Sequence, residues 1–390
     1  MNHTKDQICT AVRPYTDRLF DTACDIFDHP ELALKEFYAC EKLERLLREY
    51  GFEVEHGVGG LETAFRATWS NGDGGPIFGF MLEYDALPEV GHACGHHLQG
   101  PACIGAALAI RDLCTLPCTL VLYGTPAEEG RGGKIDMLKN GCFRECDILF
   151  CYHSGIASGV GSANKALCST RIAIHGIGAH AAAHPEKGRS ALDTLMLAFH
   201  GLEIMREHVP DGCRIHYTIS APTGPASIVH ESATALIMLR SPSRKNLSDM
   251  IRRMKLILDG ACTMCETTWE LVSQNSMENI IMSDSLRKLI LSCEDELGAD
   301  RILWDRSTSG GSSDVGNVSQ VVPVANVYTY FCDGRAHSQV WADEGKKPIA
   351  RRSMENASEV IAMTALRLLH DSQLLQIIQE EHKTLMEHEA

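Results

Sequence analysis

A chain of 390 residues exceeds what a single hydrophobic core usually organises, so two domains are the first expectation. The composition, 44% hydrophobic and 22% charged, is that of a folded globular protein, and no apolar run reaches the roughly 20 residues of a membrane-spanning helix. A net charge of −15 argues against nucleic acid and anionic membrane as partners, because both require a basic face.

The first residues are mixed and charged, without the apolar core of a signal peptide, so we expect a cytoplasmic protein. The sixteen cysteines are scattered through a long chain, which favours reduced thiols over a disulfide framework. Cys262 and Cys265 form a CxxC pair with no second pair near it, and we do not assign that pair to a metal or redox site.

The pattern of apolar residues predicts an α/β domain built around a mostly parallel sheet. A helix with a stripe of leucines ends near Gly51, a typical helix-ending residue. Later strands and helices alternate, and most of the strands are continuous apolar runs, as in strands buried on both faces. The predicted strands are 63–69, 76–84, 118–124, 147–152 and 324–331, and the helices between them are 102–113 and 134–140.

The section 166–282 has a different pattern and predicts a second domain. It reads strand, helix, strand, strand, helix, strand, which is the order of a ferredoxin-like βαββαβ unit. Because it lies inside the α/β pattern, we expect an inserted domain at 166–282 between two parts of a catalytic domain, 1–165 and 283–390. A last helix, from Asn356 to about His370, is expected to cover the first sheet.

Ionisable and soft side chains gather just after one predicted strand after another. Asp85 and a GHACGHH segment follow the strand at 76–84, and a Glu-Glu pair follows the strand at 118–124. Ligands of an open α/β sheet bind outside the carboxyl ends of its strands, so these loops should converge on one crevice. The candidate metal donors are Cys94, His96, Glu128 or Glu129, His153 and His337.

These donor types indicate a divalent transition metal. Thiolate, imidazole and carboxylate together favour zinc or manganese, with cobalt or nickel as further choices, over magnesium and calcium, which prefer oxygen ligands. Five donors exceed one closed tetrahedral site, so one ion or two adjacent ions that share a ligand are expected. A lone histidine is more often a core residue, and a structural zinc site usually shows close cysteine pairs, so the cluster as a whole favours catalysis.

The Glu128–Glu129 pair predicts acid–base chemistry at this centre. Neighbouring side chains point to opposite sides of an extended backbone, so one carboxylate can bind metal while the other accepts a proton from metal-bound water. Metal binding lowers the pKa of that water to about 7. An acidic doublet is usually a solvated turn, but here an apolar strand leads directly into it.

Four segments of the chain together resemble the aminoacylase/carboxypeptidase family of metallopeptidases, peptidase family M20. Within it, the resemblance is to the branch of p-aminobenzoyl-glutamate hydrolase and related dipeptidases. It implies a catalytic α/β domain with an inserted lid, and hydrolysis of a small amide (a dipeptide, or an N-acyl or N-aroyl amino acid) by metal-bound hydroxide. The segments are EYDALPEVGHACGHHLQG, GTPAEEGRGGK, GIGAHAAAHPEKGRSALD and GGSSDVGNVSQVVP.

The resemblance also implies roles for single residues. Glu128 is the general base, and Asp85 orients a ligand through a hydrogen bond. His180 lies on the lid and reaches the active site of a partner subunit to stabilise the oxyanion, which implies a homodimer through the lid domain. The implied metal ligands are Cys94, His96, Glu129, His153 and His337.

Substrate-binding residues are expected to depart from the family pattern. Arg240, at the end of a lid strand, is assigned to a substrate carboxylate, with a solvated strand-end arginine as the alternative. His97 stands where this branch usually has asparagine, and the segment around Ser227 lacks the asparagine that helps hold substrate in relatives. Ser313, in the last motif, is a further candidate. We therefore expect retained hydrolysis with an altered substrate.

Two other functions remain open from the sequence. The same metal site could act on an aromatic carbon that bears an amine, which would make the protein a hydrolytic deaminase. A non-catalytic metal-binding or regulatory protein on this fold is the alternative from another class, and the intact Glu128 and metal donors oppose it. The expected partner is a small amide substrate.

Overall fold

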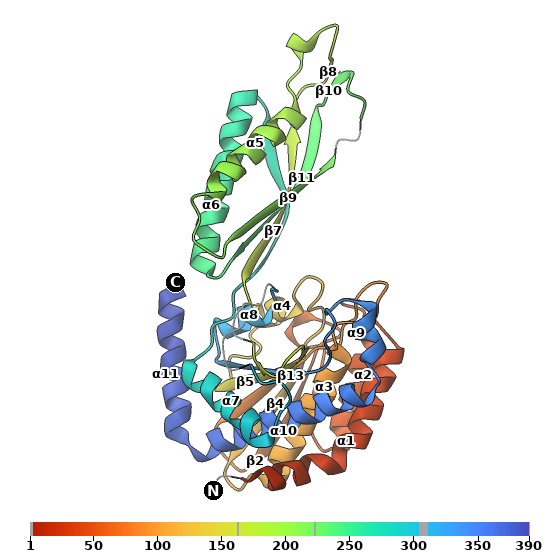
Figure 1. Ribbon diagram of the computed structural model, residues 1–390, viewed down its shortest axis with the longest axis vertical. Coiled ribbons are helices and arrows are strands. Elements are labelled where there is room, and N and C mark those ends of the chain that lie inside the picture. Colours follow the sequence, from red (N-terminus) through yellow and green to blue (C-terminus); the bar gives the residue numbers. More distant parts are fainter. Residues whose placement is uncertain (1–2, 162–163, 222–223, 304–310, 390) are drawn as a thin grey trace. The chain divides into compact units, whose positions relative to one another are not determined.

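The computed structural model describes residues 3–161, 164–221, 224–303 and 311–389, which form two compact units, each with its own hydrophobic core (Figure 1). The first unit comprises Met1–Ala163, Ile280–Ser309 and Ser313–His388. The second unit comprises Asn164–Asn279, Gly310–Ser312 and Glu389–Ala390.

The first unit is built on a seven-stranded sheet with the strand order β1-β2-β4-β3-β5-β13-β6. Its four central strands, β4, β3, β5 and β13, run parallel, and the outer strands pair antiparallel. The predicted α/β class with a mostly parallel sheet is confirmed. The strands are β1 (Glu53–His56), β2 (Phe65–Asn71), β3 (Ile77–Leu82), β4 (Cys118–Gly124), β5 (Ile148–Gly155), β6 (Gly159–Val160) and β13 (Val324–Tyr330).

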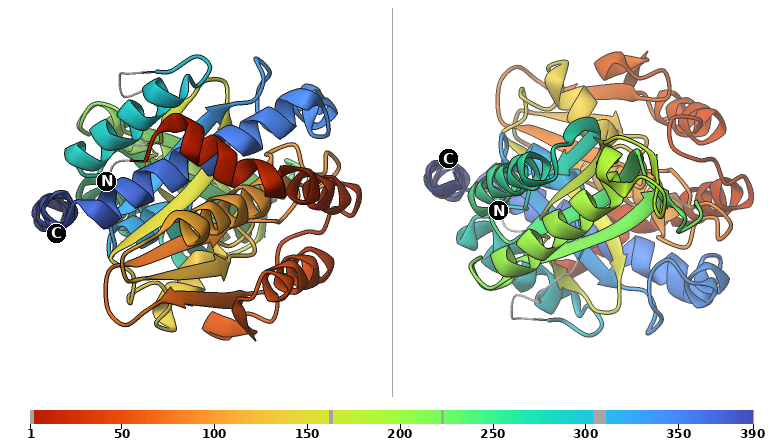
Figure 2. Two further views of the ribbon diagram at one scale, coloured as in Figure 1. Left: turned by 90° about the horizontal axis from the view of Figure 1, so that it is seen from below. Right: turned by 90° about the horizontal axis from the view of Figure 1, so that it is seen from above.

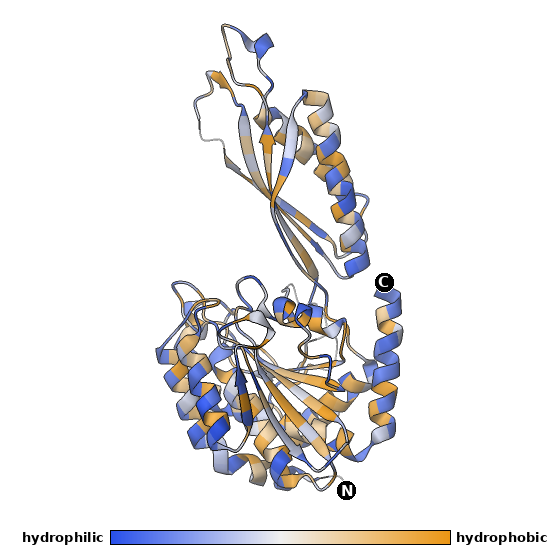
Figure 3. Cartoon of the chain, turned by 180° about the vertical axis from the view of Figure 1, so that it is seen from behind, coloured by the Kyte–Doolittle hydropathy of each residue, from blue (hydrophilic) through white to orange (hydrophobic). Residues whose placement is uncertain are grey.

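Helices cover both faces of this sheet, which explains why its central strands are apolar on both sides (Figure 3). Helices α1, α3 and α10 lie side by side over one face (Figure 2, left), and α4 and α8 pack on the other. In β3, Phe80 and Leu82 pack into the apolar cluster on one face of the sheet, and Met81 packs into the cluster on the other face. The helices are α1 (Lys5–Asp28), α2 (Phe37–Glu49), α3 (His96–Leu113), α4 (Gly133–Lys139), α7 (Asp284–Leu297), α8 (Val315–Ser319), α9 (Gln339–Glu344), α10 (Pro348–His370) and α11 (Ser372–Glu389).

Helix α3 begins at His96, six residues earlier than the pattern predicted. Gly95 is its N-cap and has φ 88°, a left-handed conformation that favours glycine. A Cβ on Gly95 would also lie 2.7 Å from the hydroxyl oxygen of Ser154. Glycine and Pro101 lower the helix propensity of the first turns, and packing in the core overrides it. The result is that Cys94 and His96 lie on either side of the helix start.

The pattern also missed the short edge strands β1 and β6 and the helices α7, α9 and α11. The edge strands, of four and two residues, are too short to show a clear period. The helix predicted to cover the first sheet is α10, and it starts at Pro348, before the predicted Asn356.

Across the residues that the structure describes, no helix combines the length and the apolar character needed to span a bilayer.

The second unit is the predicted ferredoxin-like βαββαβ fold. Its sheet is antiparallel with the order β12-β7-β11-β9, and α5 and α6 pack against it over an apolar core. A separate two-stranded ribbon, β8 with β10, completes the unit. The elements are β7 (Ala166–His175), β8 (Ala179–His180), α5 (Ala191–Arg206), β9 (Arg214–Ala221), β10 (Ile228–Val229), β11 (Ser232–Ser241), α6 (Arg244–Cys265) and β12 (Thr268–Met277).

A fully buried carboxyl group in α7 makes the stability of the first unit depend on pH. Burial raises the pKa of Glu294 to about 8, although the backbone N–H of Gly159 partly opposes this shift. An unfolded glutamate titrates near 4.3. Between these two values the folded protein binds more protons than the unfolded chain, so the free energy of unfolding falls as pH rises through this window.

We therefore expect Glu294→Gln to flatten the pH dependence of the free energy of unfolding. From about pH 5 to about pH 8, the wild type should lose on the order of a few kcal/mol more than the variant. Denaturant unfolding at both pH values measures this difference. Asp295→Asn, at an exposed neighbour on the same helix, is the control and should follow the wild type. Equal losses in wild type and Glu294→Gln would contradict the prediction.

Candidate metal centre and active site

The predicted donors meet at the carboxyl ends of the parallel strands of the first unit. His153 lies in the last part of β5, and Glu129 follows β4. His337 follows β13, and Cys94 and His96 follow β3 at the start of α3. Because β4, β3, β5 and β13 run parallel, these four segments all leave the sheet at the same edge.

The donor atoms form two overlapping groups. In the first, the Sγ of Cys94 and one ring nitrogen each of His96 and His153 lie within 4.8 Å of one another. In the second, Cys94 Sγ lies within the same limit of a Glu129 oxygen and a His337 nitrogen. The distance from Cys94 Sγ to His153 Nε2 is 3.4 Å, and that from His337 Nε2 to Glu129 Oε1 is 2.9 Å. Cys94 is therefore common to both groups.

Asp85 connects the two groups through its fully buried carboxylate. Its Oδ1 lies 3.0 Å from His96 Nδ1, and its Oδ2 accepts the backbone N–H of Glu129 at 2.8 Å. A proton on His96 Nδ1 leaves the lone pair on Nε2 free, and this buried Nε2 has no hydrogen-bond partner among the described residues. Asp85 thus orients one residue of each group.

The two remaining histidines are held in different ways, His153 through its ring and His337 through its backbone. Nδ1 of His153 donates to the carbonyl of Ser154 at 2.8 Å, which leaves Nε2 facing Cys94. The ring of Tyr328 stacks on His153, with 5.3 Å between ring centroids. His337 has φ 65°, which is uncommon for a residue other than glycine, and its N–H donates to Ala93 at 2.9 Å. The direction of the His337 side chain is therefore set by an unfavourable backbone conformation.

The charges of the cluster call for a cation. Burial raises the pKa of the Cys94 thiol, so a thiolate at this position needs a compensating positive charge. Burial lowers the pKa of His96, but Cys94 and then Asp85 raise it well above its ordinary value. Burial opposes ionisation of Glu129, yet the hydrogen bond from His337 and the charge of His96 bring its pKa down to about 2. An ionised Glu129 therefore lies beside the imidazoles of His96 and His337.

Glu128 lies between this donor cluster and a deeper group of acids. One of its oxygens is within 4.8 Å of donor atoms of His96 and Glu129, and the same limit holds for Glu83 and Asp314. Burial raises the pKa of Glu128 well above its ordinary value, and the carboxylates of Glu83 and Asp314 raise it further. A carboxyl group with a raised pKa beside a cluster of candidate metal ligands is suited to general acid–base catalysis.

The sequence interpretation assumed an extended backbone at Glu128 and Glu129, and the chain is not extended there. Residues 128–131 form a turn, and Ala127 has φ 63°. Both carboxylates therefore reach within 4.8 Å of a ring nitrogen of His96.

Four residues behind Glu128 were not identified from the sequence. The fully buried ammonium of Lys134 lies 2.6 Å from Glu83 Oε1 and 2.6 Å from Asp314 Oδ1. Nε2 of Gln99 donates to the other oxygen of Glu83 at 2.6 Å. The available signal was weak: an acid two residues before Asp85 at a strand end, and a lysine after a glycine-rich turn.

Two predicted substrate residues of the first unit are not brought to the cluster. His97 is fully buried, its Nε2 lies 2.8 Å from the carbonyl of Gly345, and its ring meets the edge of Phe27 at 4.9 Å. The hydroxyl of Ser313 accepts the N–H of Val315, the first residue of α8, at 3.2 Å.

The predicted catalytic residue His180 and the other predicted substrate residues belong to the second unit. His180 is exposed on β8, and its Nδ1 accepts the backbone N–H groups of the residues two and three positions ahead, at 3.2 and 3.1 Å. The ring proton of His180 therefore resides on Nε2, so this nitrogen can donate a hydrogen bond. Ser227 is exposed just before β10. Arg240, in β11, donates to the hydroxyl of Ser312 at 3.1 Å.

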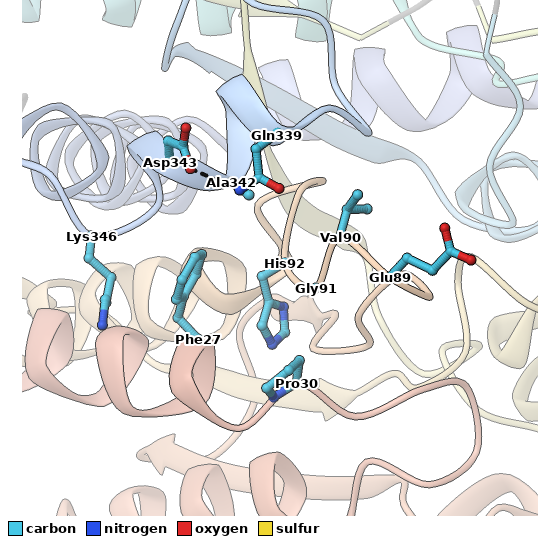
Figure 4. A pocket seen from close by; sticks show the side chains of 10 residues that line it. All are labelled: Phe27, Pro30, Glu89, Val90, Gly91, His92, Gln339, Ala342, Asp343 and Lys346. Carbon is cyan, nitrogen blue, oxygen red and sulfur yellow. Dashed lines mark hydrogen bonds between the residues drawn. The ribbon is translucent and has the colours of Figure 1, made fainter.

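A hollow of about 430 Å³ lies on one side of the first unit, between α1, α9 and the segment before Cys94 (Figure 4). His92 and Gln339 line its walls, and none of the clustered donors does. Burial and the nearby His96 lower the pKa of His92 to about 3, so its ring is neutral. The hollow marks where the segments that precede Cys94 and follow His337 face each other.

A second Cys-Glu-His group, far from this cluster in sequence, is already paired internally. Glu44 has its Oε1 2.6 Å from His56 Nδ1 and its Oε2 2.9 Å from Arg48 Nη2, and Cys40 lies 3.8 Å from the same carboxylate. Arg48 already supplies a positive charge, so we do not assign a metal to this group.

Comparison with known proteins identifies the family. The sequence profile of Peptidase family M20/M25/M40 matches residues 79–365. The chain is 29% identical to one of the polypeptides of the p-aminobenzoyl-glutamate hydrolase of Escherichia coli, over 96% of this chain and 93% of that polypeptide. It is 30% identical to the Xaa-Arg dipeptidase of Mus musculus, over 96% of this chain and 90% of that protein.

Solved structures agree on the fold. A dinuclear metal-binding peptidase of the M20 family from Bacillus subtilis superposes with a TM-score of 0.72 at 18% identity, over 92% of this chain and 99% of that one. The aminobenzoyl-glutamate utilization protein from Klebsiella pneumoniae gives a TM-score of 0.70 at 20% identity, over 91% and 97%. The predicted resemblance is confirmed. The chain belongs to peptidase family M20/M25/M40 and is a hydrolase that acts on amide or peptide bonds.

Proposed function

We propose that the protein hydrolyses the amide bond of a small substrate, a dipeptide or an N-acyl or N-aroyl amino acid, at a centre of two divalent metal ions. The observation that carries this proposal is the pair of donor groups that share Cys94, with the carboxylate of Glu128 next to them and outside both. Two groups with one common donor are the arrangement expected of adjacent ions that share a ligand.

The donors fit divalent transition metals. The buried Nε2 of His96 lies 3.4 Å from Glu83 Oε2 but has no hydrogen-bond partner among the described residues, and a buried polar atom of this kind needs a partner. A thiolate, three imidazoles and a carboxylate favour zinc or manganese, with cobalt or nickel as alternatives. The proposed ligands are Cys94, His96 and His153 for one ion and Cys94, Glu129 and His337 for the other.

The bound ions would acidify a water molecule and polarise the carbonyl of the amide. Glu128 is proposed to take the proton from the attacking water and to deliver it to the leaving nitrogen. Its burial and its acidic neighbours, which raise its pKa, suit a carboxyl group that must hold a proton between two steps. His180, whose proton resides on Nε2, is proposed to donate to the oxygen on which negative charge develops.

The names of the relatives support the substrate class. One belongs to a hydrolase of p-aminobenzoyl-glutamate, and the other is an Xaa-Arg dipeptidase. Both substrates contain an amide whose nitrogen belongs to an amino acid with a free carboxylate. We propose that Arg240 binds such a carboxylate, because guanidinium and carboxylate can form two parallel hydrogen bonds.

We further propose that the second unit is a lid that mediates a homodimer and that the protein works in the cytoplasm. A role for His180 in a partner's site requires such a dimer. All sixteen cysteines are free thiols, in line with a reducing compartment. Mass measurement of the purified chain in solution tests the dimer.

The test of this function is a hydrolysis screen with metal-loaded protein. Purified protein is expected to hold about two ions of zinc or manganese per chain. It should release a free amino acid from p-aminobenzoyl-glutamate, from dipeptides with C-terminal arginine or from N-acetyl amino acids. Ammonia release from an aminoarene, with every acyl bond intact, would instead favour a deaminase. No turnover of the whole panel by metal-loaded protein would favour a non-catalytic role.

A further inference from the structure

The loop that carries Glu128 is held by hydrogen bonds from its backbone N–H groups to buried carboxylates. Residues 125–132 connect β4 to α4. The N–H of Ala127 donates to Glu36 Oε1 at 2.9 Å, and the N–H of Glu129 donates to Asp85 Oδ2 at 2.8 Å. These two contacts fix the residues on either side of Glu128.

Lys134 fixes the end of the same loop. Its backbone N–H donates to Asp314 Oδ2 at 2.9 Å, and its ammonium lies 2.6 Å from Asp314 Oδ1 and 2.6 Å from Glu83 Oε1. Lysine is almost never fully buried unless it is paired, and here it is paired twice. The contacts of this one side chain join the end of β3, the start of α4 and the segment before α8.

The loop needs such anchors because its conformation is tight. Ala127 has φ 63°, a left-handed conformation that costs energy in residues other than glycine. Gly132 has φ 79°, and its N–H donates to the carbonyl of Ala127 at 3.0 Å. A Cβ on Gly133 would lie 2.0 Å from the carbonyl oxygen of Pro126, so the chain passes itself closely. A strained loop persists only where its surroundings hold it.

The ammonium also allows three carboxylates to pack together. Oxygens of Glu83, Glu128 and Asp314 lie within 4.8 Å of one another, a separation at which like charges repel. Lys134 places one positive charge between two of them. Without it, Glu83 and Asp314 would move apart, and the surface against which Glu128 lies would change.

We propose that Lys134 is a positioning residue, whose ammonium clamps Glu83 to Asp314 and thereby holds Glu128 where it can transfer protons. This inference rests on the proposed role of Glu128 as the base. Glu83 also lies 3.4 Å from His96 Nε2, a proposed metal-binding atom, so metal content must be measured beside turnover. The inference predicts that Lys134 acts on turnover through Glu128 and that the metal stays bound.

The experiment compares Lys134→Met, Glu128→Gln and the double variant as full-length, metal-loaded protein on the fastest-cleaved amide of the panel. Lys134→Met should lower kcat about 10²-fold, as expected for a misplaced catalytic group, with KM and metal content unchanged. The double variant should be no slower than Glu128→Gln, because residues that act as a unit are not additive. Lys139→Met, at an exposed lysine of the same helix, should keep full activity.

Three results would overturn the inference: unchanged kcat in Lys134→Met, loss of metal from that variant, or a double variant slower than Glu128→Gln by the full effect of Lys134→Met. If Lys134→Met does not fold, Asp314→Asn takes its place in the same comparison, because it removes the negative partner of the clamp and keeps the shape. A slow Glu128→Gln with a fast Lys134→Met refutes the clamp alone. A fast Glu128→Gln refutes the base as well.

Discussion

Replacing Glu128 with glutamine is expected to lower kcat by about 10²- to 10⁴-fold, the usual contribution of a general acid–base group. Glutamine keeps the size of the side chain but cannot take a proton from water or return it to a leaving amine. Glu128 lies outside the two donor groups that share Cys94, so the metal content and the melting temperature should stay close to those of the wild type. Steady-state kinetics and elemental analysis of the same preparation measure both quantities.

Glu129→Gln is the matched control, because it makes the same chemical change one residue along the chain. Glu129 belongs to a group with Cys94 and His337, so this variant should lose metal as well as activity. If the two variants behaved alike, the division of labour between the two carboxylates would be wrong. Full turnover by Glu128→Gln would remove the base from the mechanism.

Most of the donor cluster was predictable because strand direction fixes where the strands end. The runs that became β3, β4, β5 and β13 are mostly apolar on both faces, which predicts strands buried between two layers of helices. Once such strands run parallel, whatever follows each of them lies at one edge. Cys94, Glu129 and His337 therefore meet although they lie far apart in the sequence.

The choice between His96 and His97 shows what the sequence left open. Successive residues of a helix point about 100° apart, so only one of two neighbouring histidines can face the cluster. The pattern placed the helix start at residue 102 and thus treated both as loop residues. In the structure α3 begins at His96, which faces Asp85, while His97 enters the core beside Phe27.

The acids behind Glu128 were hidden for a different reason. Lys134 and Asp314 are 180 positions apart, and nothing in the local sequence of either residue indicates a buried pair. The turn at Glu128 depends on the left-handed backbone conformation of Ala127. A glycine at this position would have predicted such a conformation, but an alanine does not. These features depend on tertiary packing and cannot be predicted from local sequence. The spacing of apolar residues and the ends of strands are local features, so they can be.

Replacing Cys94 with alanine is expected to weaken metal binding by more than the 10- to 100-fold that loss of an outer hydrogen-bond partner costs, and to abolish most of the activity. Cys94 is common to both donor groups, so each ion would lose a ligand. Metal that binds only the folded state stabilises it by about 2.7 kcal/mol at a concentration 100-fold above Kd. Added metal should therefore raise the melting temperature of the chelator-treated wild type and raise that of Cys94→Ala far less.

Cys103→Ala is the control, because Cys103 is also a fully buried thiol, on α3, and contacts the carbonyl of Met81 instead of the donor cluster. Its melting temperature should rise with metal as in the wild type. A Cys94→Ala protein that still binds two ions tightly would show that the thiolate is not a ligand. Loss of one ion alone would assign Cys94 to a single site, and the two groups would then hold their ions independently. Loss of both would mean that the shared thiolate makes the two ions one centre.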